Sequence, residues 1–156
     1  MSLQKNSQDW LKKQDMKDNN FLFDASALYK LLTVYKDYTN KIDYNYIYIL
    51  DLTFYEIGNT IWKDYYLLKR ITDFTETSEV IYEILKELNI IENLSLSFIE
   101  IIKIAIEKNL TYYDASYVYA SKNFRLILVS EDKDLIEKGN AISVKEFIEK
   151  YLKNNN

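Results

Sequence analysis

Short apolar runs alternate along this chain with longer stretches in which apolar residues recur every three or four positions. The runs at residues 21–23, 46–50, 89–92, 126–129 and 141–144 have the length and composition of buried strands. The stretches at residues 52–70, 77–88, 96–108 and 111–123 have helical periodicity. Strands that alternate with helices form a parallel sheet covered by helices on both of its faces. The sequence therefore predicts an α/β fold.

The apolar positions of two of these helices predict which faces turn toward the core. These positions are Ile57, Ile61, Tyr65 and Leu68 in the first helix, and Ile99, Ile102, Ala105 and Ile106 in the third. We expect both sets to pack inward.

The length of 156 residues suits a single domain. Residues 1–20 are polar and predict an N-terminal extension, so the domain is expected to span residues 21–156. No segment approaches 18 consecutive apolar residues, which argues against a membrane span. The absence of Cys is compatible with a reducing compartment, and we expect a cytoplasmic protein.

The residue types that are missing exclude most catalytic sites. The chain has no His and no Cys, which excludes Ser-His-Asp triads, thiolate nucleophiles and zinc sites built from thiolate or imidazole. Its two Gly residues are too few for a glycine-rich phosphate loop. Carboxylates remain, at 24 Asp and Glu against 20 Lys and Arg, and their oxygens suit Mg²⁺ or Mn²⁺. An enzyme of this composition is expected to use an oxygen-ligated metal.

Four carboxylates follow predicted strands or begin helices. Asp24 ends the first strand and Asp132 follows the fourth with two residues between, while Glu56 and Asp114 lie near the starts of helices. Functional groups of parallel α/β sheets gather at the carboxyl ends of the strands, so these four acids could meet at one edge. Each also has a simpler explanation, because Asp24, Asp114 and Asp132 could be helix caps and Glu56 could lie on a solvated face.

Four sequence blocks that contain these acids resemble the PIN domain, and their order resembles the VapC type, the ribonuclease toxins of prokaryotic toxin–antitoxin pairs. The blocks are Phe23-Asp24-Ala25-Ser26-Ala27-Leu28, Tyr55-Glu56-Ile57-Gly58-Asn59, Tyr113-Asp114-Ala115-Ser116-Tyr117-Val118-Tyr119-Ala120 and Val129-Ser130-Glu131-Asp132. The resemblance covers residues 21–150. It implies a three-layer α/β/α sandwich with a central parallel sheet.

The resemblance also implies a metal-dependent endoribonuclease that hydrolyses RNA phosphodiester bonds with Mg²⁺ or Mn²⁺. The acids that match the family's catalytic positions are Asp24, Glu56, Asp114 and Asp132, and those that would bind metal are Asp24, Asp114 and Asp132. Ser26, Asn59 and Ser130 match polar positions that would support the acids. Asp134 is a possible substitute for Asp132.

The partners that the resemblance implies are an RNA substrate, a small VapB-like antitoxin and a second copy of the chain, with no membrane. Two alternatives remain open. The first is a non-catalytic PIN-like binding or scaffold module that uses the acids as caps. The second is a phospho-acceptor receiver domain, which needs adjacent acids after its first strand, whereas Asp24 stands alone.

Overall fold

The structure is a computed structural model that describes residues 16–153. Most of the predicted extension, residues 1–15, lies outside the described residues. Met16 begins a short 3-10 turn and is only 4% exposed, because it packs against the core formed by the sheet. No helix of the described residues is long and apolar enough to span a bilayer.

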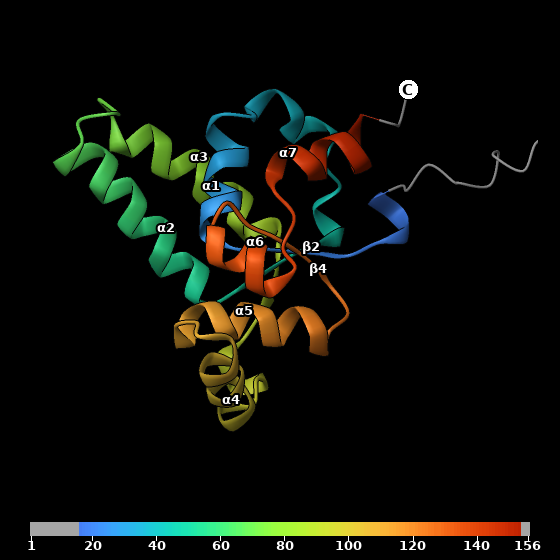
Figure 1. Ribbon diagram of the computed structural model, residues 1–156. Helices are drawn as coiled ribbons and strands as arrows, with labels where there is room; N and C mark the ends of the chain where they lie inside the picture. The colour runs from blue at the N-terminus through green and yellow to red at the C-terminus, as the bar shows by residue number, and fades with distance from the viewer. Residues whose placement is uncertain (1–15, 154–156) are drawn as a thin grey trace, which may run out of the picture.

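Four parallel strands form the central sheet, in the order β3-β2-β1-β4. The labelled strands β2 and β4 lie in the middle of the molecule, between the helices (Figure 1). They are β1 (Phe21–Phe23), β2 (Ile47–Leu50), β3 (Asn89–Ile91) and β4 (Ile127–Val129). The predicted strand at residues 141–144 is wrong, since only an isolated bridge pairs Ile142 with Val129. The reason is that Ser143 and Glu146 form a capping box, which starts a helix at Val144 before a strand can extend.

The helices are α1 (Ala25–Thr33), α2 (Leu52–Trp62), α3 (Phe74–Glu87), α4 (Phe98–Lys108), α5 (Tyr112–Asn123), α6 (Lys133–Gly139) and α7 (Val144–Phe147). Further short turns are 3-10 helices at Lys36–Lys41, Tyr44–Tyr46 and Asn93–Ser95, and π-helical turns at Lys63–Leu67 and Ile148–Leu152.

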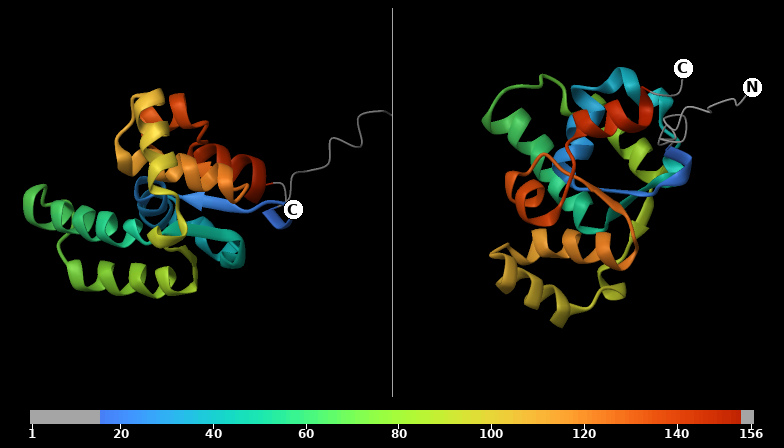
Figure 2. Two further views of the ribbon diagram at one scale, coloured as in Figure 1. Left: turned by 90° about the horizontal axis from the view of Figure 1, so that it is seen from below. Right: turned by 45° about the vertical axis from the view of Figure 1, so that its right-hand side comes forward.

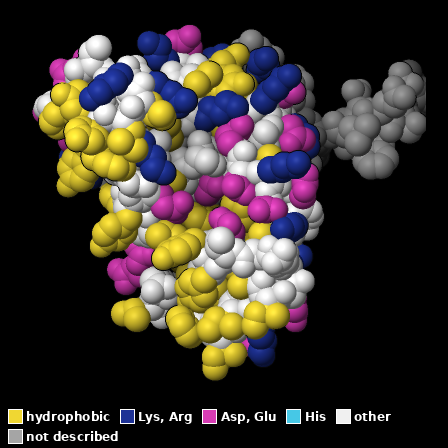
Figure 3. Space-filling view, turned by 60° about the vertical axis from the view of Figure 1, so that its left-hand side comes forward, with side chains coloured by type: hydrophobic (Ala, Val, Ile, Leu, Met, Phe, Trp, Pro, Cys, Tyr) yellow, Lys and Arg dark blue, Asp and Glu magenta, His cyan; other side chains and the backbone are white. Residues whose placement is uncertain are grey.

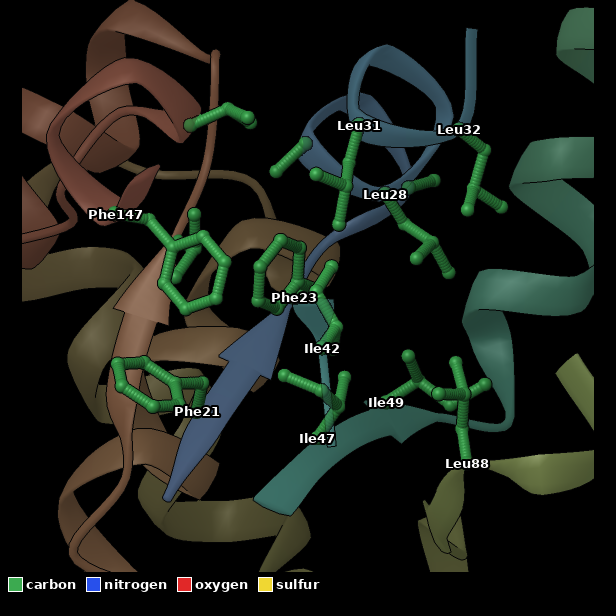
Figure 4. Close-up of a cluster of buried hydrophobic side chains, with 14 of the residues drawn as sticks. Phe21, Phe23, Leu28, Leu31, Leu32, Ile42, Ile47, Ile49, Leu88 and Phe147 are labelled. Atoms are coloured by element: carbon green, nitrogen blue, oxygen red, sulfur yellow. The ribbon is translucent and has the colours of Figure 1, made fainter. Parts of the chain in front are cut away.

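Two hydrophobic clusters cover the two faces of the sheet. Phe21 and Phe23 of β1 point to one face, where they pack with α1, α2, α3 and α7 (Figure 4). Leu22, between them, points to the other face and packs with α5 and α6. In Figure 2 the strand β1 lies between the α2–α3 pair and the α4–α5 pair. This arrangement is the expected three-layer α/β/α fold.

The structure corrects both predicted apolar faces. In the first, Ile57 and Ile61 are buried, but Tyr65 and Leu68 are exposed because the helix changes to π-helical pitch at Lys63, which rotates later residues off the stripe.

In the second, Ile99, Ile102 and Ile106 are exposed, and α4 buries Ile101 instead. The helix α4 lies at the periphery of the fold and packs mainly against α5, so its other apolar face has no neighbour in the described chain (Figure 1).

Candidate active site

Asp24 forms the buried floor of the candidate site. It follows β1 directly and caps α1, with Oδ1 accepting hydrogen bonds from the Ala27 amide at 2.8 Å and the Ser26 hydroxyl at 2.7 Å. Its Oδ2 accepts a short hydrogen bond from the Ser130 hydroxyl. Asp24 is 5% exposed, and this burial raises the pKa of its carboxyl despite the hydrogen bonds, which act in the opposite direction.

Two serines tie Asp24 to the loop that follows β4. The Ser130 oxygen accepts a hydrogen bond from the Asp132 amide at 2.9 Å, and the Ser26 oxygen accepts one from the Glu131 amide at 3.0 Å. Ser26 and Ser130 therefore contact the predicted acids, and they fix the β4–α6 loop relative to the start of α1.

Asp132 lies at the exposed rim of the same site. Its Oδ1 caps α6 by accepting from the amides of Asp134 at 2.8 Å and Leu135 at 3.1 Å. Asp134, the possible substitute, is paired with Lys138 at 2.8 Å, so its carboxylate is already partly neutralised.

Glu56 reaches the site from the second turn of α2, where it is half-buried. Its Oε1 accepts a 2.6 Å hydrogen bond from the hydroxyl of Tyr117, which also lies 2.8 Å from the Thr53 hydroxyl. Burial raises the pKa of Glu56, as do the negative charges of Asp24 and Asp114, while the Tyr117 hydrogen bond lowers it. Asn59 is exposed three residues later and has no hydrogen bond to these acids.

Asp114 lies in the first turn of α5, next to its cap Thr111. The Thr111 hydroxyl donates to Asp114 Oδ2 at 2.7 Å and accepts from the Asp114 amide at 3.1 Å. Burial raises the pKa of Asp114, the charges of Asp132 and Asp134 raise it further, and Lys138 opposes them.

These four acids form one electrostatic group, which we call the four-acid cluster: Asp24, Glu56, Asp114 and Asp132. Asp24 is repelled electrostatically by Glu56 and Asp132. Asp114 is repelled by the same two acids. Figure 3 shows acidic side chains gathered in the middle of one face of the molecule. The strand order explains this, because β1 and β4 are neighbours and the helices after β2 and before β4 border the same edge.

The chemistry of the four-acid cluster fits a hard divalent cation, since all of its donors are carboxylates and three of them have raised pKa values. Within residues 16–153, no three acidic side chains are positioned so that they could together coordinate one metal ion.

Helix capping leaves carboxylate oxygens available for such a cation. Asp24 and Asp132 do cap helices, and Asp114 does bond its cap residue, as the simpler explanation supposed. Within residues 16–153, however, Oδ2 of Asp132, Oδ1 of Asp114 and Oε2 of Glu56 accept no hydrogen bond. The capping role and a metal-binding role are therefore compatible.

Sequence reasoning missed two residues that position this site. Tyr117 holds Glu56, and its spacing of three residues from Asp114 on α5 is the signal that could have identified it. Glu131 accepts from Lys30 at 2.6 Å and from the Val144 amide at 2.9 Å, which braces the β4–α6 loop against α1 and α7. No local pattern predicts these last two contacts, because both partners are distant in sequence.

Comparison with known proteins identifies the family. No protein-family model matches the chain. The chain is 36% identical over 118 residues to the protein named Exonuclease VapC9 from Pyrobaculum aerophilum, a match that covers 76% of this chain and 84% of that protein. It also resembles the crystal structure of PAE2754 from Pyrobaculum aerophilum, with a TM-score of 0.72 and 34% identity over 83% of this chain and 87% of that one. With the fold and the order of the four acids, this similarity shows that the chain belongs to the VapC family of PIN-domain proteins.

Proposed function

We propose that the chain is a metal-dependent endoribonuclease and the toxin of a VapBC-type toxin–antitoxin system. Its family makes it a PIN-domain nuclease. The observation that carries the finer proposal is the four-acid cluster itself, in a chain that has no His or Cys for a Ser-His-Asp triad or a thiolate nucleophile. The receiver-domain alternative does not agree with the family, and the non-catalytic alternative is not favoured by a relative named as a nuclease.

In this proposal Asp24, Asp114 and Asp132 hold Mg²⁺ or Mn²⁺. A bound ion of this kind lowers the pKa of water and stabilises charge on the phosphate. Asp24 supplies a rigid anchor, because both of its oxygens are fixed by hydrogen bonds. Glu56 is held through Oε1 by Tyr117, which leaves Oε2 to orient the attacking water toward the phosphate.

The test is cleavage of a mixed RNA substrate by purified protein in Mg²⁺, in Mn²⁺ and in EDTA. We expect cleavage with either metal, none in EDTA, and none with the Asp24→Asn or Asp114→Asn variants. The Asp37→Asn variant is the matched control, since Asp37 is exposed and is not among the charges that act on Asp24, Glu56 or Asp114. Full activity in both cluster variants would show that these acids are not the ligands.

A circular RNA distinguishes internal cleavage from digestion at chain ends. We expect the circle to be opened, since Asp132 lies exposed at the rim of the site, where an internal phosphate can reach it. An intact circle alongside degraded linear RNA would replace our proposal with an exonuclease, the activity in the name of the Pyrobaculum relative.

We propose that the protein acts in the cytoplasm and that a small VapB-like antitoxin neutralises it by entering the four-acid cluster. Besides burial, the neighbouring carboxylates raise the pKa values of Glu56 and Asp114, so a basic side chain of the antitoxin would be stabilised there by the negative charges. Expression of the chain alone in a bacterial host should arrest growth, and expression of Asp24→Asn should not. Equal growth of the two strains would argue against a toxin.

We propose that a second copy of the chain covers the exposed apolar face of α4. Ile99 is 65% exposed and Ile106 is 76% exposed, on a helix whose opposite side packs on α5. Apolar surface of this kind on a short peripheral helix favours burial against an identical partner.

A further inference from the structure

A cavity of about 230 Å³ lies at the carboxyl ends of β2 and β3, and two of its lining residues are the chain neighbours of Glu56 and Asp114 in the four-acid cluster. Its walls come from the start of α2, the turn after β3 and the start of α5. Because the strand order is β3-β2-β1-β4, this cavity continues the same edge of the sheet on which Asp24 and Asp132 lie.

Two exposed tyrosines form the rim, and we therefore call it the tyrosine-rimmed cavity. Tyr55 is 79% exposed and Tyr113 is 62% exposed. Each directly precedes an acid of the cluster, Glu56 and Asp114 respectively. Within residues 16–153, neither tyrosine has a hydrogen bond or a ring contact, so both aromatic faces are open to a ligand.

The interior combines apolar walls with a few polar groups. Leu52 and Leu96 supply apolar surface and pack against the core cluster of α5. Asp51 accepts from the amide of Leu52 at 2.8 Å and from the amide of Asn93 at 2.9 Å, which fixes the wall. The Asn93 side-chain amide makes no hydrogen bond within the described residues, so it offers both a donor and an acceptor.

These features select the class of ligand. The lining contains no Lys or Arg among the described residues and includes the carboxylate of Asp51, so it disfavours a phosphate. It is smaller than the roughly 300–1,000 Å³ pockets that hold drug-sized molecules, which suits one small planar group. Aromatic rims bind nucleobases by stacking, and Asn side chains hydrogen-bond the edges of bases.

We propose that the tyrosine-rimmed cavity binds one unpaired nucleobase of the RNA, next to the phosphate that lies at the four-acid cluster. This inference rests on the proposed function. The base stacks on Tyr55 or Tyr113, and Asn93 contacts its edge. A base in a duplex cannot enter without leaving its stack, so the cavity selects single-stranded RNA.

The first test measures KM and kcat on single-stranded RNA for Tyr55→Ala, Tyr113→Ala and the corresponding Phe variants. Tyr82→Ala is the matched control, because Tyr82 is 56% exposed on α3, outside the cavity. Loss of one base–aromatic stack should raise KM about 5- to 100-fold with little change in kcat. The Phe variants should resemble the wild type, since they keep the ring. KM values for both Ala variants equal to that of the control would overturn the proposal.

The second test separates the cavity from the cleavage activity. A short RNA with one 2-aminopurine, a base whose fluorescence is quenched by stacking, is titrated with Asp24→Asn protein that does or does not carry the two Ala substitutions. We expect quenching that both substitutions abolish. If the wild-type protein cleaves no RNA but this quenching occurs, the proposed nuclease function fails, whereas the proposed binding of a base in the cavity is supported. An unquenched RNA overturns the cavity, and quenching of the matching DNA to the same extent overturns its assignment to RNA.

Discussion

Removal of one buried hydroxyl, in Tyr117→Phe, tests how the site holds Glu56. Tyr117 is 1% exposed, and its hydroxyl bonds Glu56 Oε1 at 2.6 Å and the Thr53 hydroxyl at 2.8 Å. Phe keeps the ring and its packing, so the change removes only these two interactions. Thr53 is fully buried and would lose its partner.

The expected loss of stability follows from these two interactions. A hydrogen bond to a charged group contributes about 1.5–3 kcal/mol, and an unpaired buried hydroxyl costs about 1–3 kcal/mol. The Glu56 carboxylate remains partly solvated, so we expect a total at the lower end of the combined range, about 2.5–3 kcal/mol. At about 2–4 °C per kcal/mol for a chain of this size, Tm should fall by roughly 5–12 °C.

The loss should depend on pH. Because the Glu56 pKa is already raised by burial and by its acidic neighbours, the stability that Glu56 contributes is greatest at low pH and is lost as pH rises through its pKa in the folded protein. The Tyr117 hydrogen bond limits this loss. Without it the Glu56 pKa rises further, so the variant should be destabilised more at neutral pH than below about pH 4.3, the ordinary Glu value.

Urea unfolding across this pH range measures the effect, and the pH–rate profile of RNA cleavage gives a second measurement. The acidic limb of the profile should move to higher pH in Tyr117→Phe. Tyr119→Phe is the control, because Tyr119 lies on the same helix and its hydroxyl has no hydrogen bond within the described residues. Equal stability of the two variants at neutral pH, or a loss that does not vary with pH, would refute this reasoning.

Three further predictions follow from named contacts. In EDTA at neutral pH, the Asp24→Asn variant should be more stable to urea than the wild type, because Asn still caps α1 and the buried negative charge is removed. Since burial raises the pKa of Asp24, this gain in stability should vanish at acid pH, where Asp24 is neutral as well. A variant less stable than the wild type at neutral pH would contradict the prediction. Tyr29→Phe should lose about 1–2 kcal/mol by the same measurement, since the Tyr29 hydroxyl donates at 2.7 Å to Asp64, which is 8% exposed; an unchanged midpoint would show that this bond is dispensable. Ile106→Asp should convert a dimer to a monomer by light scattering whereas Val80→Asp on α3 should not, and a dimer in both would place the interface elsewhere.

The sequence predicts the fold because periodicity reports which positions are apolar. Short apolar runs predict all four strands that form the sheet. The failures occur where neighbours decide the outcome. Ser143 and Glu146 convert a predicted strand into a helix start, and Ile99 and Ile106 are apolar at helical spacing but have no element to cover them. Periodicity identifies an apolar face but not what lies against it.

The positions of the site acids were predictable to different degrees. Asp24 and Asp132 follow strands, so the topology alone brings them to one edge. The prediction that Glu56 belongs to the site depends on the resemblance to the PIN family, since an acid on a helix is usually solvated. Tyr117 lies three residues after Asp114 on α5, a spacing that puts both residues on one face of the helix. Its partner Glu56, however, is 61 residues earlier in the chain, so the contact itself depends on how the fold brings α5 near α2.

The hydrogen bonds around Asp24 indicate which charge the site is built to hold. The Ser130 oxygen accepts the Asp132 amide and the Ser26 oxygen accepts the Glu131 amide, so each hydroxyl proton is directed to Asp24. Both oxygens of Asp24 thus accept hydrogen bonds, and a protonated Asp24 would find no neighbour to accept a hydrogen bond from its own O–H. This is the arrangement of an ionised carboxylate. Burial nevertheless raises its pKa and favours the neutral form. A nearby cation removes this conflict, because it stabilises the ionised form that the surrounding donors require.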